Sequence, residues 1–271
     1  MFLHIFVIHR KFLAYRMKIV KIIASFLLFL GILVLMVWSG IRANDQKCTG
    51  ISVVINTSGE PKLLAKSDVL GILERNNIEW EGKKIKEIEL SSIHKILAQE
   101  NYIKSVDKVH FSGSKLQIEV SLYDILLEIN SNTGQKFLLD VEGTYLPHSP
   151  KVRNDVIIVN GFINNTFQKN KTVTPENNEL YEVFTVASLI KKDPFYAALF
   201  QEMYVNDKQE IILHPSVGKL PVLFGTMQDA ENKLKTLKYM YEEVIPYTGD
   251  EKYAQLDVRF KNRIVATKTK S

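Results

Sequence analysis

Histidine is the first residue type to test for chemistry in this chain, because imidazole can act as a general base or bind a metal ion. The sequence contains six histidines, widely spaced: His4, His9, His94, His110, His148 and His214. None of the last four has a second histidine within one helical turn, and the chain has only one cysteine. The spacing of zinc-binding helices and cysteine pairs is therefore absent, and the sequence predicts no metal site.

Carboxylates offer a second possibility, since Asp140 and Glu142 are close enough in sequence to work as a pair. They stand at the end of an apolar run and directly before Gly143, so we expect a turn there. The sequence contains no G-x-S-x-G elbow, phosphate-binding loop or dinucleotide fingerprint. These patterns predict a non-enzymatic protein with no catalytic residues, no cofactor and no small-molecule substrate. A membrane-tethered hydrolase with groups joined only in space remains the alternative.

A long apolar run lies near the amino terminus. Residues 22–41 are uncharged and lie between Lys21 and Arg42. A helix of this length is about 30 Å long and matches the hydrocarbon core of a bilayer. Five basic residues and no acidic residue precede the run, which predicts a cytoplasmic tail at 1–21 and export of the remainder. We therefore expect a single-pass protein of the plasma (inner) membrane.

Two alternatives concern this amino-terminal region. A cleavable signal peptide is disfavoured, because its apolar core would exceed the usual length of about 7 to 15 residues. Translation could also start at Met17, which would leave a compact basic segment before the apolar run.

Charge and cysteine content narrow the possible partners. The formal net charge of +5 equals the five basic residues before Ile22, so the remainder is neutral overall. A neutral exported region lacks the basic surface that nucleic-acid backbones require. The single cysteine, Cys48, excludes an intramolecular disulfide. We interpret it as a spectator thiol, with a cross-link to a partner as the alternative.

Residues 47–124 have the pattern of a small α+β domain. Residues 51–55 are β-prone, and two amphipathic helices follow, the first capped by Ser67 and the second by Ser91 or Ser92. A hairpin with strict alternation from Leu116 to Leu122 completes a β-α-α-β-β order. In this arrangement two helices cover one face of a three-stranded sheet. The order resembles a POTRA module, with an unrelated α+β unit as the alternative.

Residues 125–271 predict a mostly antiparallel β domain with a few helices, so the fold class of the chain is α+β. Turn residues separate the short β-prone runs, which are 125–130, 136–140, 156–160 and 210–214. Helical spacing occurs at 181–189 and 194–199 and from Thr226 onward, where Thr226 and Asp229 occupy capping positions. Pro246 and Gly249 are expected to end this last helix.

The carboxyl-terminal residues predict a final strand at the edge of that domain. Apolar side chains alternate from Leu256 to Ala266, and Asn262 interrupts them in the manner of a bulge. An edge strand offers unpaired N–H and C=O groups to a partner backbone. The segment from Leu256 to the end carries five basic residues against Asp257, which favours an acidic partner. Prevention of aggregation by edge charges is the alternative explanation.

From Lys18 to about Lys268 the chain resembles the FtsQ/DivIB family of bacterial cell-division proteins. The resemblance includes the basic tail, the apolar anchor at 22–41 and the POTRA-like unit. Two sequence motifs support the resemblance as well. The first is FLLDVEGTYLP at residues 137–147. The second is LPVLFG at residues 220–225, followed by a helix at Lys233-Leu234 and by LDVRF at 256–260. Residues 121–124, SLYD, depart from the family pattern, which commonly has a basic residue there.

The resemblance implies a scaffold of the divisome that binds FtsB/FtsL-type bitopic proteins and helps to control septal peptidoglycan synthesis at the division septum. A POTRA-type assembly or sensor module is the alternative. By this analogy a partner segment is held against the last strands of the β domain. The implied partner-binding residues are Leu256, Val258, Arg259, Phe260, Lys261, Arg263, Ile264 and Val265.

Overall fold

The computed structural model describes residues 25–36, 46–57, 63–152, 156–176, 178–218, 220–261 and 263–269. Of the predicted anchor at 22–41, residues 25–36 are described, and they form a helix with exposed side chains. Across these described ranges, no helix is both long enough and apolar enough to cross a membrane. The predicted tail at 1–21, with Met17, lies outside the described residues.

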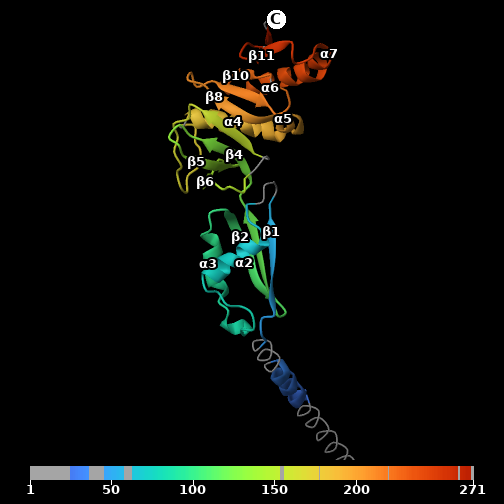
Figure 1. Cartoon of the computed structure of the whole chain (residues 1–271). Helices are drawn as coiled ribbons and strands as arrows, with labels where there is room; N and C mark the ends of the chain where they lie inside the picture. Colours follow the sequence, from blue (N-terminus) through green and yellow to red (C-terminus); the bar gives the residue numbers. More distant parts are fainter. Residues whose placement is uncertain are drawn as a thin grey trace, which may run out of the picture.

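The first globular domain is a three-stranded sheet covered by two helices (Figure 1). Its sheet order is β1-β3-β2, with β1 parallel to β3 and β2 antiparallel to β3. The predicted β-α-α-β-β order is confirmed. The elements are β1 (Gly50–Asn56), α2 (Lys66–Arg75), the short 3-10 helix η1 (Ile85–Glu87), α3 (Leu90–Ala98), β2 (Ile103–Ser112) and β3 (Lys115–Leu122).

The predicted helix caps in this domain are wrong by two or three positions. Helix α2 has Ala65 as its N-cap, so Ser67 lies inside the first turn. Helix α3 has Glu89 as its N-cap, and the hydroxyls of Ser91 and Ser92 each donate to the Glu89 carboxylate at 2.8 Å. These serines therefore bond to an acidic side chain at the helix start instead of to backbone N–H groups.

The core of the POTRA-like domain forms between the helices and the sheet. Ile72 on α2 and Ile93 on α3 are buried with Ile118 on β3. Cys48 belongs to the same cluster and is 1% exposed. Its thiol packs as a small apolar group, which agrees with a spectator role and leaves it inaccessible to a partner's thiol in the folded domain.

The second domain is built on a nine-stranded sheet whose order is β12-β11-β10-β9-β8-β7-β4-β5-β6. Its strands are β4 (Ile125–Asn130), β5 (Lys136–Asp140), β6 (Tyr145–Pro147), β7 (Ile157–Gly161), β8 (Phe200–Val205), β9 (Ile211–Pro215), β10 (Val222–Gly225), β11 (Tyr253–Asp257) and β12 (Val265–Lys268). Most neighbours pair antiparallel, as predicted, but β4 with β7, β7 with β8 and β10 with β11 are parallel. The sheet is therefore mixed.

Helices pack on this sheet through apolar side chains at helical spacing. Val183 and Val186 of α4 and Leu234 of α6 are buried in one cluster with Phe200 and Phe224. The helical elements are α4 (Asn178–Lys192), α5 (Pro194–Leu199), α6 (Ala230–Tyr239), the π-helix η2 (Met240–Val244) and α7 (Ile245–Thr248). The positions predicted for helices at 181–189 and 194–199 agree with α4 and α5.

The carboxyl-terminal helical segment begins after Asp229 and ends at Gly249, as predicted, but Thr226 and Pro246 do not have their predicted roles. Helix α6 starts at Ala230 after Asp229, so Thr226 is not its cap. Pro246 lies in the first turn of α7, where its missing N–H is not needed. The segment ends at Gly249, whose φ of 77° suits glycine.

The two domains share an apolar junction. Only Tyr123 and Asp124 separate β3 from β4. Tyr102 of the POTRA-like domain donates its hydroxyl to the carbonyl oxygens of Pro147 and His148 at 3.3 and 3.1 Å. Ion pairs join Lys104 to Glu142 and Lys151 to Asp68. The junction encloses a third buried cluster, made of Leu63, Ile125, Leu138, Leu146, Val152 and Val156.

The two ends of the nine-stranded sheet differ in their accessibility. At one end, the N–H of Tyr145 in β6 donates to the carbonyl oxygen of Lys171, and the N–H of Val173 donates to that of Gly143. The chain around Lys171 therefore shields this edge. At the other end, β12 pairs with β11 on one side, and no described segment pairs with its other side.

Candidate partner-binding site at the carboxyl-terminal edge

The predicted continuous strand from Leu256 to Ala266 is wrong, because the chain makes two strands joined by a connection at 258–264. Asp257 causes the break. Its carboxylate accepts the backbone N–H of Arg259 at 3.1 Å, which turns the chain out of β11. The position of the predicted bulge, Asn262, lies outside the described residues.

Two of the predicted partner-binding residues belong to the core of the domain. Leu256 lies in β11, between β10 and β12, and is fully buried. Val258 is 2% exposed, and its N–H donates to the carbonyl oxygen of Leu223 at 3.1 Å. Both side chains lie in the main core cluster of the domain, so they support the sheet and are not exposed to a partner.

Arg259 is held by two carboxylates of its own chain. Its guanidinium donates twice to Asp257, at 2.9 and 2.7 Å, and once to Glu210 at 2.8 Å. The hydrogen bonds from Arg259 lower the pKa of both Asp257 and Glu210, and the two carboxylates raise the pKa of Arg259. Arg259 is therefore paired within its own chain, and its predicted role in binding an acidic partner stays a prediction.

The other predicted residues lie at the surface. Phe260 is 42% exposed and Val265 43% exposed, whereas Ile264 packs partly against the core. The Arg263 guanidinium lies over the Phe260 ring, 5.0 Å from its centre. Lys261 and Arg263 are exposed, and neither forms an ion pair with a described side chain. Arg259 is exposed as well but is paired, so Lys261 and Arg263 are the unpaired cations among the described residues of this connection.

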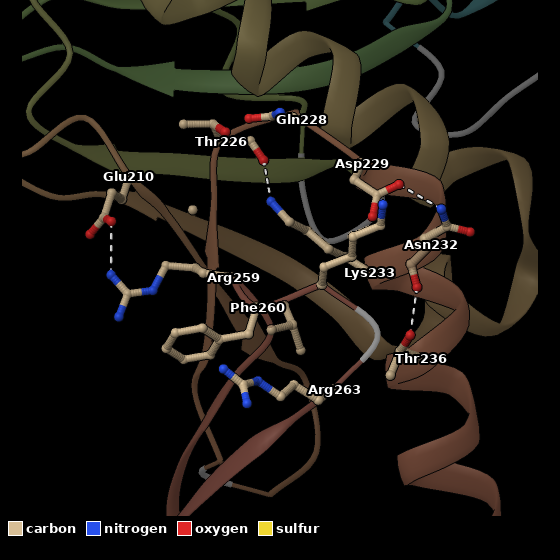
Figure 2. A pocket seen from close by; sticks show the side chains of 13 residues that line it. Glu210, Thr226, Gln228, Asp229, Asn232, Lys233, Thr236, Arg259, Phe260 and Arg263 are labelled. Atoms are coloured by element: carbon tan, nitrogen blue, oxygen red, sulfur yellow. Dashed lines mark hydrogen bonds and ion pairs between the residues drawn. The ribbon is translucent and has the colours of Figure 1, made fainter.

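A groove of about 610 Å³ lies between the connection and the first turns of α6 (Figure 2). Val258, Arg259, Phe260, Lys261 and Arg263 line one side, and the other side is lined mainly by residues before and within α6: Gly225, Thr226, Gln228, Asp229, Asn232, Lys233 and Thr236. Figure 2 shows the ammonium of Lys233 directed at the carbonyl oxygen of Thr226, a bond of 2.9 Å. Burial lowers the pKa of Lys233. The groove is polar and has mixed charge.

The backbone of β12 has hydrogen-bonding groups that face away from β11. The N–H of Thr269 donates inward to the carbonyl oxygen of Lys252 at 3.0 Å. Because successive residues of a strand alternate, the N–H of Lys268 points outward, and so does that of Ala266. An extended partner segment could pair with these groups.

The remaining candidate residues do not form a second site. Asp140 accepts the N–H groups of Glu142 and Thr144 at 3.0 and 2.6 Å, which is the predicted turn role. Burial raises the pKa of Asp140. Within the described ranges, no group of histidine, cysteine and acidic residues could hold a metal ion, and His4 and His9 lie outside these ranges.

Comparison with known proteins agrees with this architecture. A family model described as FtsQ/DivIB, C-terminal related, matches residues 125–267, more than half of the chain. The chain belongs to the FtsQ/DivIB family. A POTRA-like domain model matches residues 46–121 of this FtsQ/DivIB protein. A search of curated proteins found no match to the chain. The two matches indicate a cell-division scaffold with protein partners in the divisome, and both families are generally non-enzymatic.

Glu210 and Lys233 are the functional candidates that the sequence did not predict. Glu210 contacts Arg259 across 49 positions of sequence, and Lys233 reaches the groove from α6. Opposite charge was the only available signal for the Glu210–Arg259 pair, and many other residues share it. Lys233 carried a weak signal, because it falls in a family motif.

Proposed function

We propose that this FtsQ/DivIB protein is a non-enzymatic divisome scaffold that binds FtsB/FtsL-type bitopic proteins and helps to control septal peptidoglycan synthesis. In this proposal residues 22–41 anchor it in the plasma (inner) membrane. Its amino terminus is cytoplasmic, both globular domains are extracytoplasmic, and it gathers at the division septum. A partner segment adds as a further strand to β12.

The observation that carries this proposal is the position of β12 at the end of the sheet order. Strand addition needs a row of unpaired backbone groups, and the outward N–H groups of Ala266 and Lys268 meet that need. Exposed Lys261 and Arg263 lie in the connection that leads to this edge, where they would favour an acidic partner.

A pair of substitutions at one position tests strand addition. Lys268→Pro removes the outward N–H and the charge, whereas Lys268→Ala removes only the charge. Proline is tolerated on an edge strand when the lost N–H faces solvent, so both variants should fold. In pull-downs of the full-length protein from detergent-solubilised membranes, we expect Lys268→Pro to lose FtsB/FtsL-type proteins and Lys268→Ala to retain most of them.

Equal capture by Lys268→Pro and wild type, with both folded by circular dichroism, would show that the partner does not pair with this edge. Absence of any division protein from the wild-type pull-down would contradict the scaffold function itself.

A further inference from the structure

Residues at the ends of three strands of the sheet meet around Arg259. This arrangement suggests that Arg259 has a structural role in addition to supplying positive charge. Asp257 ends β11, Glu210 directly precedes β9, and Gly225 ends β10. The Arg259 guanidinium bonds to the carboxylates of Asp257 and Glu210, and Figure 2 shows its arm extended toward Glu210. A bidentate bond to one carboxylate and a third bond to another fix the guanidinium in orientation as well as in position.

Gly225 makes room for this arm. A Cβ at position 225 would lie 2.9 Å from Cγ of Arg259 and 3.2 Å from its Cδ. Gly225 also has a φ of 79°, which side-chain-bearing residues rarely adopt. The aliphatic part of Arg259 therefore crosses the end of β10 where no side chain is present.

Strand β12 has few contacts of its own that could hold it in place. It has four residues, and the side chains of Val265, Thr267 and Lys268 are exposed. Among the strands that the structure describes, it pairs with β11 alone. A short strand with little buried apolar area opens easily, so its order depends on the connection that precedes it.

We propose that Arg259 is a positioning residue, which clamps the connection 258–264 to the sheet and thereby holds the edge strand β12 ready for a partner strand. This inference rests on the proposed function and assigns different tasks to neighbouring basic residues. Arg259 is bonded to Asp257 and Glu210 and acts within the protein. Lys261 and Arg263 remain available to an acidic partner segment.

Hydrogen exchange of the full-length protein in detergent, measured by mass spectrometry, tests the clamp directly. In Arg259→Ala, we expect the amides that face β11, those of Val265, Thr267 and Thr269, to exchange roughly 10- to 100-fold faster, as for the loss of charge-assisted hydrogen bonds. Residues 125–140, far along the sheet, should be unaffected. Lys261→Ala is the matched control, because it removes an unpaired cation from the same connection and should leave this exchange unchanged.

Two further variants separate positioning from charge. Gly225→Ala retains every charged group but displaces the arm of Arg259, so exchange of the amides that face β11 should again increase. Arg259→Lys keeps the positive charge, yet one ammonium cannot reproduce the three guanidinium bonds. We expect it to restore little of the wild-type protection or of the capture of FtsB/FtsL-type proteins.

Wild-type exchange of the amides that face β11 in Arg259→Ala would overturn the clamp. Faster exchange without reduced partner capture would overturn its role in positioning the edge. If the wild-type protein captures no division protein, the proposed function fails, and the exchange measurements still decide whether Arg259 orders β12.

Discussion

The backbone N–H of Val258 donates to the carbonyl oxygen of Leu223, which joins the first residue after β11 to β10. Val258→Pro removes this bond from a position that is 2% exposed. Leaving the carbonyl oxygen unpaired should lower the free energy of unfolding by about 1–3 kcal/mol. Urea unfolding, with Lys268→Pro as the edge-strand control, measures the effect. An unchanged midpoint in Val258→Pro would show that the Val258–Leu223 bond contributes nothing.

Asp140 provides a test of a buried turn residue. Its carboxylate accepts two backbone N–H groups, yet burial raises its pKa, so the charged form is disfavoured in the folded protein. Asp140→Asn keeps an accepting oxygen without the charge, and we expect stability at neutral pH equal to or above that of wild type. Asp140→Ala removes the acceptor of both N–H groups and should lower the free energy of unfolding by about 1–3 kcal/mol. Equal destabilisation of both variants in urea unfolding would contradict this explanation.

The carboxylates around Arg259 predict a loss of stability in acid. The pKa values of Asp257 and Glu210 are lower in the folded protein than in the unfolded chain, because Arg259 donates to both. The two carboxylates therefore stabilise the folded protein above their pKa values in the unfolded chain, which are roughly 4. This stabilisation is lost as the pH falls below that range. Thermal midpoints between pH 7 and pH 3 should fall less steeply in Asp257→Asn than in wild type. Parallel pH profiles would argue against this linkage.

The apolar junction predicts coupled unfolding of the two domains. Leu146 is 4% exposed and belongs to the buried cluster at the junction. Leu146→Ala should lower the free energy of unfolding by about 2–5 kcal/mol, because it removes buried apolar atoms and leaves a cavity. Because this cluster joins the domains, we expect calorimetry to resolve two transitions in the variant and one in wild type. Leu127→Ala, in the main core of the second domain, is the control. A single lowered transition in Leu146→Ala would contradict the coupling.

Local patterns predicted much of the fold from sequence. The alternation from Leu116 to Leu122 gave the hairpin of β2 and β3, since its register depends on neighbouring residues. The β-prone runs at 125–130 and 136–140 coincide with β4 and β5. The parallel pairing of β10 with β11 was not predictable, because it depends on residues far apart in the chain.

The candidate site was predicted only in part, and Asp257 shows why. The alternation from Leu256 to Ala266 favoured one strand, but the bond from the Asp257 carboxylate to the N–H of Arg259 competes with strand geometry. Arg259 then bonds to Glu210, 49 positions away, which no local pattern could indicate. Amino-acid composition does not distinguish one basic residue from another. In the folded protein Arg259 is paired with carboxylates, whereas Lys261 is unpaired.

The shielding of β6 by the chain around Lys171 limits how copies of this protein can associate. Open-ended fibres by sheet extension need two free edges on every molecule, and within the described part of the chain the nine-stranded sheet offers only the β12 edge. Two copies that met there would pair the same strand around a twofold axis and form a closed dimer. Such a dimer would occupy the surface proposed for the partner, so self-association and partner capture would compete for one strand.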